Sequence, residues 1–232
     1  FNPLLIYSSP GLGKTHLVQA AGNRMIRKNR SVRVLYITGE KFMLDFISSI
    51  QKNKSSEFVN FYRKIDMLLL DDVQFFVGKE QTQEQFFHLF NDLYQKEKQI
   101  ILTTDRHPRK LVGLQERLVS RFQSGLVADI QPPDLETRIA IIMNEAKHGG
   151  IDIEYSIVEF IASSVTGDIR LMKSLLVRLQ ALSTLKNIDI DIDLCKAVIK
   201  ETLGDVQLQN ITFLQILSSI CTLQILCSSS TI

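Results

Sequence analysis

The chain carries, close to its start, a stretch of residues suited to binding a nucleotide phosphate. Residues 8–15 read SSPGLGKT, and Gly13, Lys14 and Thr15 fill the last three positions of the pattern G-x-x-x-x-G-K-[ST]. In such a loop successive backbone N–H groups face the phosphates, Lys14 would neutralise their charge and the Thr15 hydroxyl would hold Mg²⁺. Ser8 replaces the first glycine of the pattern, so this match alone leaves an incidental glycine-rich turn as an alternative.

Two adjacent carboxylates supply the second half of such a site. Residues 67–72 read MLLLDD, an apolar strand followed by Asp71 and Asp72. Ligands collect at the C-terminal edge of a parallel sheet, where Asp71 would hold the water shell of Mg²⁺ and Asp72 would orient or polarise the attacking water. A helix cap or solvated turn explains one such aspartate more easily than two. Together the two motifs predict a nucleotide site.

Further polar residues could complete this chemistry. Asp105 follows the apolar run 100–103 at the same predicted sheet edge, where it would sense a γ-phosphate or the water, or simply cap a turn. Arg117 and Arg121 lie four residues apart on one helical face, and no acidic residue lies four positions from Arg121. An arginine that reaches the γ-phosphate of a neighbouring subunit would explain this pattern. A solvated arginine is the alternative.

A third arginine lies near a predicted helix start. The segment Gly167-Asp168-Ile169-Arg170 reads as a helix N-terminus with Asp168 as its cap. Arg170 would then lie in the first turn, where the helix dipole disfavours a cation unless an anion is nearby. A bound triphosphate would be such an anion, and an ion pair between Arg170 and Asp168 is the alternative.

The elements that would position these residues alternate between apolar runs and amphipathic segments. This alternation is typical of βαβ units and predicts an α/β fold with a five-stranded parallel sheet. The expected strands are 4–7, 32–37, 67–70, 100–103 and 126–130. Val18, Ala21 and Met25 recur at helical spacing, so we expect the loop 11–14 to lead from the first strand into a helix.

The pattern of apolar, polar and charged residues also divides the chain into three segments. Two consecutive prolines end the strand pattern after the last expected strand, and residues 135–203 have a helical pattern. We therefore expect an α/β core over 1–132, a small all-α domain over 133–204 and an atypical tail over 205–232. No charged residue follows Asp205, but several Gln and Asn residues argue against a membrane segment. A frameshifted or otherwise replaced C-terminus explains the abrupt change in composition better than a membrane segment does.

Composition excludes some classes of function. Charged residues make up 22% and the hydrophobic set 45% of the 232 residues, which is typical of a globular protein and not of a disordered one. The net charge of +2 provides no broad field for nucleic acid, so any DNA contact must be local. The cysteines lack metal-ligand spacing, and no basic segment precedes an apolar run at the start. These features predict a reduced, cytoplasmic protein.

With these residues assembled, the chain resembles the DnaA family of bacterial replication initiators, within the AAA+ superfamily. The resemblance covers about residues 1–204 and is dense in NPLLIY, GLGKTHL, LLLDDVQFF, GKEQTQEQFFHLFN, ILTTDR, ERLVSRF and DIQPPDLETRIAI. The blocks DDVQF, FFHLFN and QPPDLETR are far more specific than either phosphate-binding motif. The resemblance implies an AAA+ P-loop core and a helical lid, with ATP or ADP and Mg²⁺ bound at their junction.

The resemblance also assigns roles at the nucleotide site. The residues expected to bind the nucleotide are Gly11, Leu12, Gly13, Lys14, Thr15, His16, Asp105, Arg117 and Arg170. Thr15 and Asp71 would hold Mg²⁺, and Asp71, Asp72 and Arg121 would act in hydrolysis. Arg121 matches the arginine finger through which ATP-bound subunits assemble into a filament on origin DNA.

Further partners follow from the same resemblance. The insert 40–62 resembles the initiator-specific helices that line a channel for single-stranded DNA, with Ile47 at the apolar contact position. Lys79 and Gln81 fall in a basic segment that also touches that strand. Acidic phospholipids are a further partner that the family brings into consideration. A helicase or helicase loader is not expected, because the chain begins after the N-terminal partner-binding domain.

The sequence departs from the family at several positions. Ser8 and Ser9 replace two glycines, Gln81 replaces an arginine and so removes a phosphate contact, and the ELEGAL that usually follows Arg170 reads LMKSLL. We predict that Ser8 weakens triphosphate binding, because the backbone has less conformational room and a side chain stands near the phosphates. The leading expectation is an ATP-dependent replication initiator with slow, regulatory hydrolysis. A DnaA-like regulatory adaptor without the duplex-reading domain and an inactive truncated fragment are the alternatives.

Overall fold

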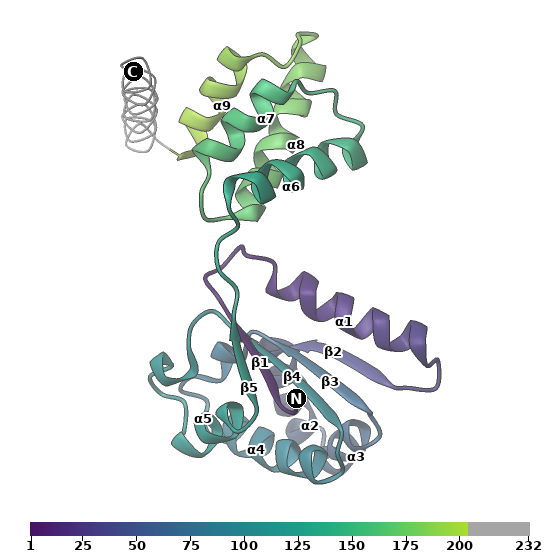
Figure 1. Cartoon of the computed structure of the whole chain (residues 1–232). Helices are drawn as coiled ribbons and strands as arrows, with labels where there is room; N and C mark the ends of the chain where they lie inside the picture. Colours follow the sequence, from purple (N-terminus) through teal and green to yellow (C-terminus); the bar gives the residue numbers. More distant parts are fainter. Residues whose placement is uncertain (204–232) are drawn as a thin grey trace, which may run out of the picture. The chain divides into compact units, whose positions relative to one another are not determined.

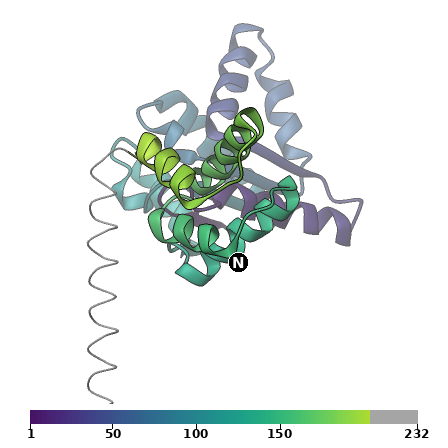
Figure 2. The ribbon, with the colours of Figure 1, turned by 90° about the horizontal axis from the view of Figure 1, so that it is seen from above.

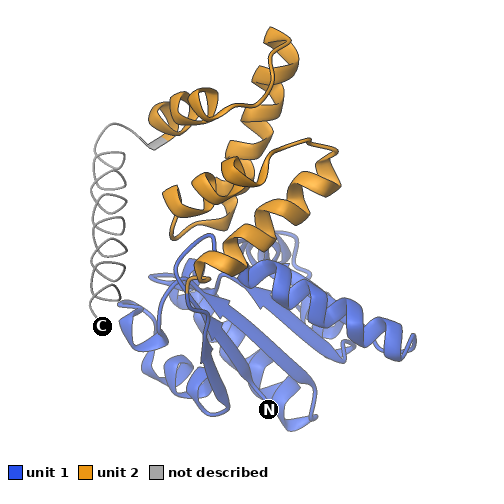
Figure 3. Cartoon of the chain, turned by 45° about the horizontal axis from the view of Figure 1, so that its top comes forward, with its two compact units in different colours: residues 1–131 blue, residues 132–232 orange. Residues whose placement is uncertain are grey.

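The computed structural model of the chain describes residues 1–203, which form two compact units (Figures 1 and 3). The first unit spans residues 1–131, and the second begins at Pro132. The tail predicted over 205–232 lies outside the described residues. Among residues 1–203, no helix combines the length and the apolar character needed to cross a membrane.

The first unit is built on five parallel strands in the order β2-β3-β4-β1-β5. They are β1 (Leu4–Tyr7), β2 (Val34–Thr38), β3 (Met67–Asp71), β4 (Gln99–Thr104) and β5 (Leu126–Asp129). All five predicted strands are confirmed, with small shifts at their ends. β3 is buried along its whole length, as its continuous apolar run predicts for a strand covered on both faces.

Helices cover both faces of this sheet. They are α1 (Lys14–Lys28), α2 (Gly39–Gln51), α3 (Ser55–Arg63), α4 (Glu80–Gln95) and α5 (Glu116–Gln123), with short 3₁₀ turns η1 (Val73–Phe76) and η2 (Pro108–Lys110). Figure 1 shows α1 on one face and α2 to α5 on the other. The predicted passage from the loop 11–14 into a helix is confirmed by α1.

Alternate residues of β3 supply the two cores that this layering creates. Leu68 and Leu70 join the larger core beneath α2 and α4, whereas Met67 and Leu69 join a smaller core with Val18 of α1. This division follows from the two-residue period of a strand, in which successive side chains point to opposite faces. Because β3 is fixed from both sides, the acidic pair that ends it is held in place.

The second unit contains four described helices around one core. They are α6 (Leu135–Gly149), α7 (Tyr155–Ser164), α8 (Ile169–Lys186) and α9 (Ile192–Leu203), which confirms the helical pattern read over 135–203. Asp134 caps α6, because its carboxylate accepts a hydrogen bond from the Thr137 amide at 2.8 Å. Cys195 is fully buried in this core, and burial raises the pKa of its thiol to about 12. The thiol therefore packs as an apolar group.

Candidate functional site

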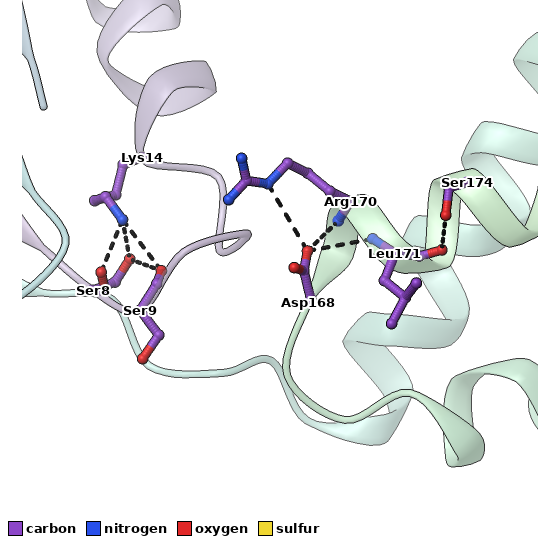
Figure 4. A network of polar contacts seen from close by, with 7 residues as sticks. All are labelled: Ser8, Ser9, Lys14, Asp168, Arg170, Leu171 and Ser174. Carbon is purple, nitrogen blue, oxygen red and sulfur yellow. Dashed lines mark hydrogen bonds and ion pairs between the residues drawn. The ribbon is translucent and has the colours of Figure 1, made fainter. Parts of the chain in front are cut away.

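The phosphate-binding loop connects β1 to α1. Gly11 and Gly13 have φ values of 85° and 89°, a left-handed conformation that favours glycine. Nothing lies within 4 Å of the place where a side chain at Gly13 would begin. The ammonium of Lys14 donates hydrogen bonds to the carbonyls of Ser8 (2.8 Å) and Ser9 (3.2 Å), as Figure 4 shows. The loop thus has glycines where positive φ is needed. Its lysine donates to carbonyl oxygens at the start of the same loop.

Ser8 acts on Lys14 through its side chain. It is not among the positive-φ residues of the described chain, so its backbone does not require glycine. This finding corrects the expectation that Ser8 restricts the backbone of the loop. The buried Ser8 hydroxyl donates to the Ser9 carbonyl (2.9 Å) and accepts from Lys14 Nζ (3.2 Å). We still predict that Ser8 weakens triphosphate binding, but only because its side chain lies near Lys14 and the phosphates.

The carboxylate of Asp71 joins this loop to the sheet. Asp71 ends β3 and is 2% exposed. Its Oδ2 accepts hydrogen bonds from Thr15 Oγ1 (2.6 Å) and from the Tyr36 phenol (2.9 Å), and its Oδ1 accepts one from the Thr103 hydroxyl. A buried carboxylate without such donors would be costly. Three hydroxyl donors from α1, β2 and β4 therefore fix the orientation of this carboxylate.

Two of these donors, Tyr36 and Thr103, are site residues that we did not predict. Tyr36 lies on β2, which pairs with β3, and Thr103 lies on β4 on the other side of β3. Burial, followed by the hydrogen bond to Asp71, raises the pKa of Tyr36 to about 12, so its phenol stays a donor at neutral pH. The sequence indicates these two residues only as hydroxyl side chains within apolar strand segments, 32–37 and 100–103. The strands formed by these segments flank the strand that ends in Asp71.

Asp72 is joined to Asp71 through Thr103, but its carboxylate has a different partner. It has a φ of 61°, a left-handed backbone conformation that directly follows the end of β3 at Asp71. Its amide donates to Thr103 Oγ1 (2.8 Å), and its carboxylate accepts from Gln74 Nε2 (2.9 Å). The Gln74 oxygen accepts in turn from the Asp105 amide (3.3 Å). Gln74 therefore links the second acid to the end of β4, a role that the sequence reading missed.

At the end of β4, the side chain without a hydrogen-bond partner among the described residues is that of Thr104, not that of Asp105. The Asp105 carboxylate is paired with Arg106, through Nε at 2.9 Å and Nη2 at 2.6 Å. Thr104 is fully buried, and its Oγ1 has no hydrogen-bond partner among the described residues. Its carbonyl accepts from the Ser8 amide at 3.3 Å, so Thr104 lies beside the phosphate-binding loop. A buried unpaired hydroxyl is costly and calls for an absent partner.

These groups fit a Mg²⁺-bound nucleotide. The space in front of Gly13 is open, Thr104 has an unpaired hydroxyl, and Thr15 with Asp71 offers the oxygen ligands that Mg²⁺ prefers. Within residues 1–203, no cluster of three or more His, Cys, Asp or Glu side chains could hold a metal by itself. Mg²⁺ commonly takes only one or two protein carboxylates and completes its shell with water and substrate phosphates. The donor set therefore suits a metal that arrives with a nucleotide.

The two arginines of α5 lie over an aromatic ring. The guanidinium carbons of Arg117 and Arg121 lie 4.8 and 6.0 Å from the centre of the Phe87 ring, which belongs to α4. Arg117 Nε also donates to Gln115 Oε1 at 2.8 Å. Across the described residues, no ion pair involves either arginine. The structure therefore provides no salt bridge that would account for Arg121.

The residues expected to contact DNA lie on exposed parts of the first unit. Figure 2 shows α2 and α3 as a pair that projects from the sheet. Large apolar side chains exposed on this pair are Leu44, Ile47, Ile50 and Phe61. Lys79 and Gln81 are exposed at the start of α4. Gly39 begins α2 directly against the Asp72 carbonyl, 2.6 Å from where its side chain would begin. This contact joins the projecting pair to the acidic end of β3.

In the second unit, Asp168 caps α8 as predicted. Its Oδ1 accepts from the amides of Arg170 (2.8 Å) and Leu171 (3.3 Å). The Arg170 Nε lies 4.0 Å from the same oxygen, and the Arg170 side chain is 69% exposed (Figure 4). The structure thus shows the alternative that we considered, an ion pair between Arg170 and Asp168, the residue that caps its helix. So long and exposed an ion pair contributes little stability.

The parallel strand order, the glycine loop between β1 and α1 and the acidic pair after β3 define a P-loop domain of the AAA+ class. A family model narrows this class. The family described as "Bacterial DnaA ATPAse domain" matches residues 1–129, and the chain belongs to this family.

Individual relatives agree with this assignment. The chromosomal replication initiator protein DnaA of Geobacter metallireducens is 47% identical over 205 residues, which cover 88% of this chain and 46% of that protein. The crystal structure of domain III from the Thermotoga maritima replication initiation protein DnaA is 40% identical, with a TM-score of 0.83, and the match covers 87% of this chain and 84% of that one. A structure of replication initiator DnaA bound to AMPPCP and single-stranded DNA is 40% identical, with a TM-score of 0.71 and coverage of 80% and 59%. The chain spans less than half the length of the curated relatives that it matches.

Proposed function

We propose that this chain is the ATP-binding core of a bacterial replication initiator. In this proposal ATP and Mg²⁺ bind the first unit, ATP-bound copies assemble on origin DNA and contact its single strands, and slow hydrolysis resets the assembly. The observation that carries the proposal is the 2.6 Å hydrogen bond from Thr15 Oγ1 to Asp71 Oδ2. It brings together the two side chains that hold Mg²⁺ in P-loop ATPases. The related DnaA bound to AMPPCP, an ATP analogue, and single-stranded DNA supports the same reading.

Lys14 supplies the positive charge of the site. Its ammonium donates to the neutral oxygens of Ser8 and Ser9. Charged phosphate oxygens are stronger acceptors than neutral carbonyls and hydroxyls. We therefore expect Lys14 to exchange these contacts for oxygens of the β- and γ-phosphates. The N-terminus of α1 adds backbone N–H donors and the positive end of its dipole.

Thr15 and Asp71 are the residues that would hold Mg²⁺. When bound, Mg²⁺ neutralises phosphate charge and orients the phosphates for attack. Tyr36 and Thr103 act on the protein side of this arrangement, because their hydroxyls donate to Asp71 and keep the carboxylate in one orientation. They are positioning residues in the proposal.

Asp72 is the residue proposed to orient the attacking water. Its carboxylate already accepts a hydrogen bond from Gln74 at 2.9 Å, so a water must share this acid with an amide donor. This arrangement supports slow hydrolysis. The Thr104 hydroxyl, which has no hydrogen-bond partner among the described residues, would donate to the γ-phosphate or to the water in this proposal.

Assembly and DNA contact would use other faces of the first unit. Arg121 would reach the γ-phosphate bound by a neighbouring copy, since no carboxylate of the described chain pairs with it. The projecting pair α2–α3 would meet single-stranded DNA with its exposed apolar side chains, Ile47 among them at 41% exposure. Lys79 would add a phosphate contact, whereas Gln81 adds no charge. In the second unit, Arg170 offers an exposed guanidinium to an anionic ligand.

An equilibrium ATP titration tests this proposal. We expect Lys14→Ala to weaken ATP binding by about 100-fold, because the buried ammonium is the main positive charge of the loop. Lys28→Ala, at the exposed far end of the same helix, is the matched control and should bind as the parent does. Equal ATP affinity in the parent and the Lys14→Ala variant would show that the loop does not bind the phosphates.

A further inference from the structure

Helix α4 presents two side chains to α5 that the proposed mechanism does not use. Gln83 and Phe87 lie four residues apart, one turn along the same side of α4, and α5 packs next to this helix (Figure 1). Gln83 is fully buried, and Phe87 is partly buried against the main core. Each contacts a different part of α5.

Gln83 ties the start of α5 to α4. Its Nε2 donates to the carbonyls of Phe76 (2.8 Å) and Gly113 (2.9 Å), and its Oε1 accepts from the Gln115 amide (2.8 Å). These three backbone groups belong to the end of η1, the loop before α5 and the N-cap of α5. Because a buried amide with lost partners is costly, this clamp fixes the origin and direction of α5.

Phe87 lies one turn further on, beneath the arginines of that helix. Arg117 lies 4.8 Å and Arg121 6.0 Å from the ring centre, and about 6 Å is the range over which an aromatic face attracts a cation. Two like charges four residues apart on a helix repel each other. The negative face of one ring attracts both guanidinium groups and so holds them on the same side of α5.

We propose that Phe87 positions the arginine finger: its ring holds the Arg121 guanidinium in place before the triphosphate of a second copy of this chain arrives. This inference rests on the proposed function, in which Arg121 contacts that triphosphate. Holding Arg121 in advance reduces the side-chain entropy that assembly must remove. Arg117 lies closer to the ring and is also bonded to Gln115. Arg121 is thus the more weakly held of the two and transfers to phosphate oxygens, which bind a guanidinium more strongly.

Two substitutions at one position separate this role from simple packing. Phe87→Leu keeps an apolar side chain but removes the aromatic face, whereas Phe87→Tyr keeps that face. We expect the Phe87→Leu variant to need about three- to fivefold more protein for ATP-dependent assembly, measured by sedimentation velocity. The Phe87→Tyr variant should assemble as the parent does. ATP affinity at concentrations below assembly should be unchanged in both, because the cation–π contacts of Phe87 in the described chain are with α5, and not with the phosphate-binding loop or with Asp71 and its donors.

Arg121→Ala, examined in parallel, separates failure of this inference from failure of the proposed function. If Arg121→Ala assembles normally, the arginine-finger role in the proposed function is wrong. If Arg121→Ala fails to assemble while Phe87→Leu folds and assembles as the parent does, the role of Phe87 is wrong. Equal losses in the Leu and Tyr variants would also overturn it, because the aromatic face would then not matter.

A measurement on the unassembled parent tests the contact without relying on assembly or on a variant at Phe87. The Arg121 Nε–H resonance, assigned by its disappearance in Arg121→Lys, should show an upfield ring-current shift in the ADP state. The corresponding Arg109 Nε–H, whose nitrogen lies 3.5 Å from Gln123 Oε1 and whose guanidinium has no cation–π contact among the described residues, is the reference. An Arg121 resonance at the Arg109 position would overturn the proposal even if Phe87→Leu proved unable to fold.

Discussion

Thr103 and Thr104 are consecutive, fully buried residues of β4 that differ completely in hydrogen bonding. The Thr103 hydroxyl donates to Asp71 and accepts from the Asp72 amide at 2.8 Å. The Thr104 hydroxyl, on the opposite face of the strand, has no partner in the described chain. One threonine therefore supports the acidic pair, and the other, whose carbonyl accepts from the Ser8 amide, has a hydroxyl without a partner in the described chain.

This contrast predicts that only one of the two threonines contributes a hydrogen bond to stability. Thr103→Val should lower the free energy of unfolding of the first unit by about 1–3 kcal/mol, because it leaves a buried carboxylate without one of its donors. Thr104→Val should leave it nearly unchanged, since no hydrogen bond is lost and valine has the same shape. Urea denaturation of the two variants checks this prediction. Equal destabilisation of both would contradict the hydrogen-bond assignment.

The same pair predicts a difference in chemistry. Thr104→Val should lower the rate constant of ATP hydrolysis at saturation by at least about tenfold, because it removes the hydroxyl that is proposed to donate to the γ-phosphate or the water. ADP affinity, which does not involve the γ-phosphate, serves as the internal control and should stay within about twofold. An unchanged hydrolysis rate in a folded variant would remove Thr104 from the site.

Tyr36 is expected to affect Mg²⁺ rather than the nucleotide itself. Tyr36→Phe removes only the phenol oxygen that donates to Asp71 at 2.9 Å. We predict ATP binding about three- to tenfold weaker in Mg²⁺ and unchanged in EDTA, since one hydrogen bond typically contributes about 0.5–1.5 kcal/mol. Isothermal titration in the two buffers gives the comparison. An equal loss in both buffers would show that Tyr36 acts on the nucleotide or on folding instead.

Ser8 offers a substitution that should improve the site. Ser8→Gly removes a hydroxyl that accepts from Lys14 at 3.2 Å and keeps the carbonyl that accepts at 2.8 Å. We expect ATP to bind about two- to fivefold more tightly, because one competitor for the ammonium is gone. Ser9→Gly is the matched control, since it keeps the Ser9 carbonyl that accepts from Lys14. If the two variants bind ATP equally, the Ser8 hydroxyl does not compete with phosphate.

Sequence patterns predict the elements that carry this site because those patterns are local. The apolar runs give five strands, and two glycines with a lysine give the loop between β1 and α1. Asp168 is recognisable as a cap from its own neighbours, and the amides that it caps confirm it.

The contacts that organise the site depend on residues far apart in the chain. Tyr36 and Asp71 are separated by 35 residues, and Thr103 and Asp71 by 32. Their meeting follows from the order β2-β3-β4, which no local pattern contains. The unpaired hydroxyl of Thr104 is likewise visible only once every neighbouring polar group has been placed.

The most direct test of the proposed function is the Mg²⁺ dependence of ATP binding in the parent and in Asp71→Asn. Asp129→Asn, at the exposed end of β5, is the control for loss of a negative charge, and thermal unfolding verifies that the variants fold. We predict that Mg²⁺ tightens ATP binding at least about tenfold in the parent and in Asp129→Asn, and has no such effect in Asp71→Asn. A folded Asp71→Asn variant that keeps the full Mg²⁺ effect would contradict the assignment of Thr15 and Asp71 as the metal-nucleotide site.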